Sequence, residues 1–92
     1  LAKFGAVSKE SALELAQGIR QKFSSTIGIS VTGISGPTGG TSEKPVGLVF
    51  IGYSKKNCDF VKKYIFHGDR KAINFRTTKV AIDIVRRKLI YE

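Results

Sequence analysis

Two stretches of the chain carry apolar residues at helical spacing, one near each end. The first predicts a helix from about Ser8 to Phe23, because its apolar residues fall three or four positions apart. Ser8 suits the N-cap, since a serine hydroxyl accepts a hydrogen bond from the first turn. The second predicts a helix capped by Asp69. Its apolar stripe comprises Ile73, Thr77, Val80, Ala81, Ile84, Val85 and Leu89.

Three stretches between these helices have the pattern of strands. Residues 27–31 alternate apolar and small side chains, and this strand delivers Thr32 to a glycine-rich loop. Val46 to Tyr53 is nearly all apolar, which is typical of a central strand covered on both faces. Phe60 to Phe66 carries lysines among apolar residues and is expected at a sheet edge. Because a turn over residues 54–59 separates the last two strands, we expect an antiparallel hairpin.

The resulting order, α-β-β-β-α, predicts a layered α/β fold with helices packed on a sheet and with one antiparallel hairpin. The 92 residues form one domain at most. A chain of this length buries a modest share of its surface, so its core alone would be marginally stable. It begins with Leu1 and contains no methionine, which favours a fragment or a processed chain.

The chain is strongly basic, with 16 lysines and arginines against 7 acidic residues and a formal net charge of +9. Such an excess attracts nucleic acids, acidic membranes or phosphorylated small molecules, and solvated charge that serves solubility is an equal alternative. No signal peptide or membrane span is predicted, so the cytoplasm is the expected location. The single Cys58 excludes an internal disulfide framework, and one histidine with one distant cysteine predicts no metal site.

The connection between the first two strands is the most distinctive feature of the sequence. Residues 33–47 hold five glycines and both prolines, which together give a shaped loop that other groups can approach closely. It is no Walker A loop, because a strand follows it, and no Rossmann loop, because Gly-x-Gly is absent. We interpret it as a binding loop for a small polar or phosphorylated ligand. A wide connection without function is the alternative.

Two cations are the sharpest single candidates for binding. Arg70 falls in the first helical turn, where the helix dipole disfavours a cation, and an anionic ligand would compensate. An ion pair with Asp69 is the alternative explanation. Lys44 precedes Pro45 and could direct its ammonium group at a phosphate, or it could be an ordinary exposed loop lysine. His67 is interpreted as structural, and no sequence context supports catalysis by Cys58.

Three segments together resemble one family. They are Phe-Gly-Ala-Val-Ser at residues 4–8, the glycine loop from Thr32 to Gly47, and Phe-His-Gly-Asp-Arg at residues 66–70. In this order they are similar to the C-terminal domain of the competence/damage-inducible protein CinA, the nicotinamide-nucleotide amidase family. The resemblance covers essentially the whole chain. The long loop motif is highly specific, and the two shorter motifs are useful only in its company.

The resemblance implies an α/β/α fold that hydrolyses the carboxamide of nicotinamide mononucleotide to nicotinate mononucleotide and ammonia. It implies no metal and no organic cofactor. Substrate binding is carried over, position by position, to Thr32, Gly36, Gly39, Gly40, Thr41, Lys44 and Arg70. Thr32 and the loop amides would orient the nicotinamide-ribose end, and Arg70 would meet negative charge. A homo-oligomer is also expected.

The chain departs from the family in two ways. Family members carry a further upstream stretch with Thr-Ala-Glu-Ser-Cys-Thr-Gly-Gly, which holds the proposed nucleophilic serine. Residues 1–92 are therefore expected to be the C-terminal part of one such domain, inactive alone, with no catalytic residue and with the missing N-terminal part as partner. Asn74 stands where many relatives have arginine, which puts one anion contact in doubt.

Two hypotheses that assign the chain to other functional classes remain open. Lys62-Lys63 and Arg86-Arg87-Lys88 could form a nucleic-acid patch in a small basic module linked to competence or DNA damage, although no RNA-binding motif or helix-turn-helix accompanies them. The chain could also be a structural piece whose loop holds a subunit interface.

Overall fold

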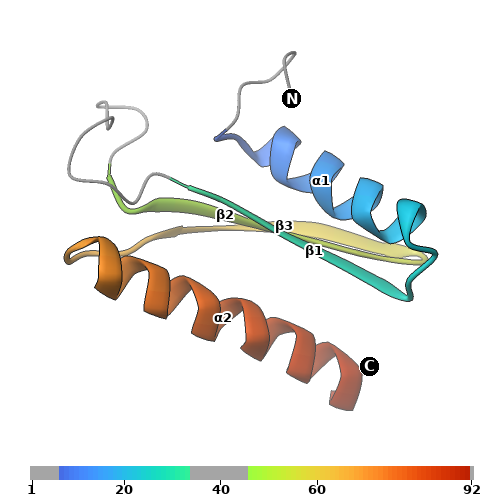
Figure 1. Cartoon of the computed structure of the whole chain (residues 1–92). Helices are drawn as coiled ribbons and strands as arrows, with labels where there is room; N and C mark the ends of the chain where they lie inside the picture. The colour runs from blue at the N-terminus through green and yellow to red at the C-terminus, as the bar shows by residue number, and fades with distance from the viewer. Residues whose placement is uncertain (1–6, 34–45, 92) are drawn as a thin grey trace.

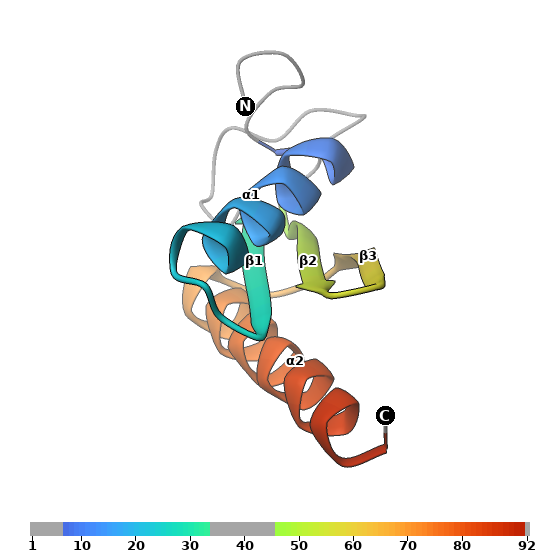
Figure 2. The ribbon, with the colours of Figure 1, turned by 90° about the vertical axis from the view of Figure 1, so that its right-hand side faces the viewer.

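The computed structural model describes residues 7–33 and 46–91. Their elements are, in chain order, α1 (Lys9–Lys22), β1 (Ile27–Gly33), β2 (Leu48–Lys55), β3 (Cys58–Ile65) and α2 (Arg70–Tyr91). The strands form one antiparallel sheet in the order β1-β2-β3. Helix α1 covers one face of the sheet and α2 covers the other (Figures 1 and 2). The predicted α-β-β-β-α order and α/β/α layering are confirmed.

Strand β2 occupies the centre of the sheet, as its apolar sequence predicts. It pairs with both neighbours, and six of its eight residues are buried. Strand β3 lies at an edge, and its lysines are exposed. The expected turn over residues 54–59 is too long. Ser54 pairs with Asp59 within the strands, and the turn itself is Lys56-Asn57, where Asn57 adopts the left-handed conformation at φ 66° that asparagine tolerates.

Helix α1 packs very closely on the sheet because the facing side chains are small. A Cβ atom at Gly28 would lie 2.1 Å from the carbonyl oxygen of Ala16, and one at Gly52 would lie 2.3 Å from that of Ala12. The hydroxyl of Ser30 donates a hydrogen bond to the same Ala12 carbonyl. The small-residue face of β1 is therefore the face on which α1 rests.

Polar contacts fasten α1 to the hairpin end of the sheet. Arg20 Nε donates to Ser54 Oγ at 2.9 Å, and Gln17 Nε2 donates to Asp59 Oδ2 at 2.8 Å. Hydrogen bonds from Ser54 and Gln17 lower the pKa of Asp59, and the nearby charge of Arg20 acts in the same direction. Ser54 is fully buried because this partner on α1 satisfies its hydroxyl, which explains why a polar residue extends β2 rather than ending it.

The opposite face of the sheet holds the hydrophobic core. Val49, Ile51 and Tyr53 of β2 pack with Ile73 and Ile84 of α2. Tyr53 also stacks on Phe60, with ring centroids 4.8 Å apart.

Helix α2 moves away from the sheet toward its C-terminal end (Figures 1 and 2). Its predicted apolar stripe is accordingly buried at Ile73 and Thr77, whereas Leu89 is 63% exposed.

Candidate ligand-binding end of the sheet

The ends of the glycine loop and the start of α2 meet at one end of the sheet. β1 ends at Gly33 and β2 begins at Leu48, which pairs with Ile65 at the end of β3. Arg70 follows a few residues later as the first residue of α2 (Figure 1). The topology thus brings two of the three motif segments together. The predicted site residues Gly36, Gly39, Gly40, Thr41 and Lys44 lie outside the described residues.

Gly47 fixes the point where the glycine-rich segment joins β2. Its φ is +93°, and an added Cβ would lie 2.0 Å from the carbonyl oxygen of Phe66. The Phe66 amide in turn donates to the Gly47 carbonyl at 2.9 Å. Only glycine allows this conformation and approach without strain. The backbone therefore ties the start of β2 to the segment that leads into α2.

Thr32 lies near the end of β1 with its side chain on the α1 face, because it alternates with Ser30, which bonds to α1. Its hydroxyl oxygen is buried and has no hydrogen-bond partner within residues 7–33 and 46–91. A buried hydroxyl without a partner costs about 1–3 kcal/mol. Thr32 and Arg70 thus lie at the same end of the sheet, with the Thr32 side chain on the α1 face and Arg70 on the helix that covers the other face.

Asp69 is the N-cap of α2, as predicted. Its Oδ1 accepts a hydrogen bond from the Ala72 amide at 2.8 Å, and its carbonyl accepts one from the Ile73 amide at 3.0 Å. The carboxylate of Asp69 therefore caps the helix, and within the described residues it forms no ion pair with Arg70. Arg70 is exposed, and in the described part of the chain its guanidinium contacts no acidic partner.

A basic residue that the sequence pattern did not single out supports the turn before α2. Arg76 Nη1 donates to the carbonyl oxygen of His67 at 2.7 Å. Gly68, next in the turn, has φ +121°. His67 is exposed, and its backbone rather than its imidazole is engaged, in line with a structural role. Nothing in the sequence separates Arg76 from the other exposed cations of α2, because its partner is a backbone carbonyl fixed by the fold.

The described residues do not meet the requirements of a metal site or of a membrane span. They contain no group of three histidine, cysteine or acidic residues that could hold a metal ion. Neither α1 nor α2 has a stretch apolar and long enough to span a bilayer. Cys58 is half-buried and begins β3.

The two helices and the antiparallel sheet between them define a small layered α/β domain, and comparison with known proteins gives its family. The sequence profile of the CinA C-terminal domain matches residues 1–89. The chain therefore belongs to the CinA C-terminal domain family, and the predicted resemblance is confirmed.

Individual relatives agree with this assignment. The chain is 56% identical over 90 residues to a competence-damage inducible protein of Clostridium tetani, and 52% identical to a CinA-like protein of Kosmotoga olearia. Each match covers 98% of this chain and 22% of the relative. The chain thus spans about a fifth of the length of the curated relatives it matches.

Solved structures have the same fold. A CinA superfamily protein of Klebsiella pneumoniae superposes with a TM-score of 0.89 at 27% identity, over 100% of this chain and 57% of that one. A competence/damage-inducible protein of Agrobacterium tumefaciens superposes with a TM-score of 0.80 at 35% identity, over 92% of this chain and 53% of that one. These solved chains contain nearly as much sequence again as the part that matches.

Proposed function

We propose that this chain is the C-terminal part of a nicotinamide-nucleotide amidohydrolase domain, which hydrolyses the carboxamide of nicotinamide mononucleotide to nicotinate mononucleotide and ammonia. The observation that carries the proposal is the convergence at one end of the sheet. Both ends of the glycine loop, the buried hydroxyl of Thr32 and the exposed Arg70 lie there. Membership of the CinA C-terminal domain family supports it.

Amide hydrolysis needs a nucleophile, a base and donors that stabilise an oxyanion. In the proposed division of labour, this chain supplies binding groups. The cation of Arg70 meets the phosphate, the loop amides and Lys44 surround the polar end of the substrate, and Thr32 orients it. The nucleophilic serine comes from the N-terminal part of the domain, which makes that part the obligatory partner.

An apolar groove on the β1 side of α2 suits that partner. It measures about 460 Å³, and it is lined by Ile29, Ala81, Ile82, Val85, Arg86 and Leu89. Ile82 and Leu89 are more than 60% exposed, and Val31 on the adjacent edge strand is 47% exposed. Exposed apolar patches of this kind mark interaction surfaces. The solved relatives carry enough additional chain to cover the groove. A homo-oligomer that uses the same face stays an alternative prediction.

Ammonia release from nicotinamide mononucleotide tests the proposal. The purified 92-residue chain alone should release none, and addition of the separately produced N-terminal part of the domain should restore release. A serine-to-alanine change of the nucleophile in that added part is the matched control and should abolish it. Turnover by the 92-residue chain alone would refute the division of labour, and an inactive but stably assembled pair would refute the amidohydrolase assignment.

A further inference from the structure

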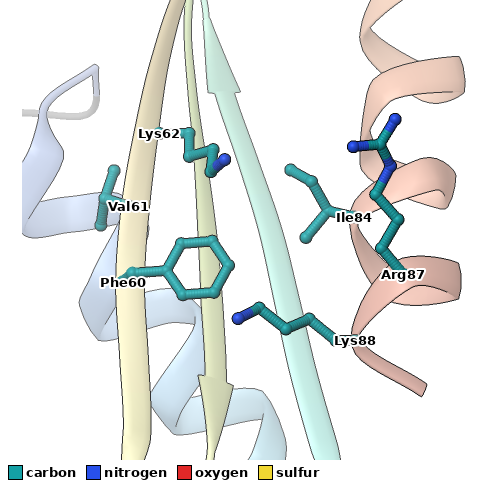
Figure 3. Close-up of a pocket in the computed structure, with 6 residues that line it drawn as sticks. All are labelled: Phe60, Val61, Lys62, Ile84, Arg87 and Lys88. Carbon is teal, nitrogen blue, oxygen red and sulfur yellow. The ribbon is translucent and has the colours of Figure 1, made fainter. Parts of the chain in front are cut away.

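A second pocket lies at the other end of α2, far from Arg70. It occupies about 350 Å³ between β3 and the C-terminal half of α2, and its lining residues are Phe60, Val61, Lys62, Ile84, Arg87 and Lys88 (Figure 3). We call it the β3–α2 pocket. Ile84 follows Arg70 by 14 residues, which corresponds to about 21 Å along a helix at about 1.5 Å per residue. The pocket is therefore separate from the glycine-loop end.

Three cations line the β3–α2 pocket, and two of them lie over an aromatic ring. The ammonium of Lys88 lies 5.1 Å from the centroid of the Phe60 ring, and that of Lys62 lies 5.9 Å from it. Figure 3 shows Lys88 reaching from α2 toward the ring, with Lys62 on the sheet side of the same space. No carboxylate is among the six lining residues. The pocket thus places positive charge beside the apolar surface of Phe60 and Ile84.

The third cation is already oriented by a neighbour. Arg87 Nε donates to Asp83 Oδ2 at 2.9 Å, and Asp83 also accepts a hydrogen bond from Arg86 Nη2 at 2.8 Å. The ion pair with Asp83 engages the Nε–H of Arg87, which leaves the N–H groups of its two terminal nitrogens to meet a ligand. A guanidinium presents five donors in a fixed fork that matches phosphate and carboxylate geometry.

We propose that the β3–α2 pocket binds a small phosphorylated aromatic molecule of the mononucleotide class, in addition to the ligand of the glycine-loop end. The planar part would lie against Phe60 and Ile84, and the phosphate would meet Lys62, Arg87 and Lys88. The volume falls in the range of small-molecule sites, about 300–1,000 Å³. The groove proposed for the rest of the domain lies on the β1 side of α2, so both surfaces can be occupied together.

The fold favours a small anion over a nucleic-acid strand. The expected basic patch of Lys62-Lys63 with residues 86–88 is divided by the structure. Lys63 is on the α1 face of β3, since side chains alternate along a strand. Arg86 lies beside Asp83 outside the pocket lining. The cations that remain together line a concave space rather than a continuous stripe, which suits a compact ligand.

Adenosine monophosphate is the probe for the test, in a titration of the isotopically labelled 92-residue chain followed by amide NMR shifts. We expect saturable shifts at residues 60–62 and 84–88. Inorganic phosphate and adenosine should each bind at least about tenfold more weakly, because each makes only part of the contacts. Lys62→Ala should weaken binding about tenfold, and Lys63→Ala, its neighbour on the other face, less than about twofold.

A second pair of variants shows that weaker binding is not due to unfolding. Lys88→Ala should weaken binding as Lys62→Ala does, whereas Lys79→Ala, on the same helix outside the pocket, should leave binding unchanged. A native amide spectrum of each variant establishes that it is folded. Shifts confined to residues 33, 47 and 68–71 would overturn the proposal, as would equal weakening by Lys63→Ala and Lys62→Ala. If a single-stranded oligonucleotide bound more tightly than adenosine monophosphate, with shifts spread over the surface, nucleic-acid binding would replace the proposed small-molecule site.

Discussion

The two helices meet the same sheet in opposite ways. Helix α1 rests on Gly28, Ser30 and Gly52 so closely that backbone almost touches backbone, and hydrogen bonds from Gln17 and Arg20 fasten it to the hairpin. Helix α2 meets large apolar side chains at its start and then diverges, leaving grooves and pockets on both sides. The close interface leaves no room for a ligand or a partner. Binding surfaces are therefore to be expected on the α2 face and at the glycine-loop end of the sheet.

The largest effect should come from enlarging a glycine under α1. Gly52→Val would place a branched side chain where even a Cβ lies 2.3 Å from the Ala12 carbonyl. Because that obstacle is backbone, α1 must shift, and we expect a loss of about 3 kcal/mol or more in the free energy of unfolding. Urea denaturation measures it. A loss below about 1 kcal/mol would show that α1 is not held in close contact.

Shortening side chains on α2 to alanine should destabilise the chain more where the helix packs on the sheet than where it diverges from it. Ile84→Ala removes a core side chain that is 8% exposed, and we expect a loss of about 2–3 kcal/mol. Leu89→Ala, five residues further along α2, should cost less than about 1 kcal/mol in the isolated chain, because Leu89 is already 63% exposed. Urea denaturation of both variants checks this contrast. Equal losses would contradict the divergence of α2.

A smaller gain is expected on the outer surface of α1. Gly18 has open space around an added Cβ, in contrast to Gly28 and Gly52. Gly18→Ala should therefore stabilise the chain by about 0.5–1 kcal/mol, through the better helix propensity of alanine. The midpoint of thermal unfolding measures this gain. A lowered midpoint would contradict the open space around Gly18.

The smallest effect should be the pH dependence due to Asp59. Its pKa is lowered in the folded chain, so its contribution to stability is present above the ordinary aspartate value of about 4 and is lost as the pH falls below that value. The amount is less than about 1 kcal/mol, because the group is exposed. Asp59→Asn should flatten the acid limb of the stability curve below about pH 4. An unchanged acid limb would show that the Gln17 and Ser54 contacts do not persist in solution.

Local patterns predicted the elements and their places in the sheet. The apolar run of β2 predicted a central strand, and Asp69 lies where a cap residue is needed. The turn was predicted too long because Ser54 and Asp59 are polar, and their partners Arg20 and Gln17 lie on a helix far away in sequence. Contacts over such separations leave no trace in a local pattern.

The candidate site shows the same limit. Chain order alone brings Arg70 and the loop ends to one end of the sheet, whereas the face on which Thr32 lies depends on the strand register. The β3–α2 pocket could not be predicted at all. Lys62 and Lys63 are equivalent in sequence, and only the pairing of β3 with β2 decides which of them faces Arg87 and Lys88.

The most direct test compares two neighbouring cations at the start of α2, in the domain reassembled from this chain and its N-terminal part. Arg70→Ala should raise the KM for nicotinamide mononucleotide about 10- to 100-fold, as expected when a charge-assisted contact to the phosphate is lost. Lys71→Ala, one residue further along the same turn, should change it less than about threefold. Equal KM values for Arg70→Ala and the unmodified domain would contradict a substrate site at this end of the sheet.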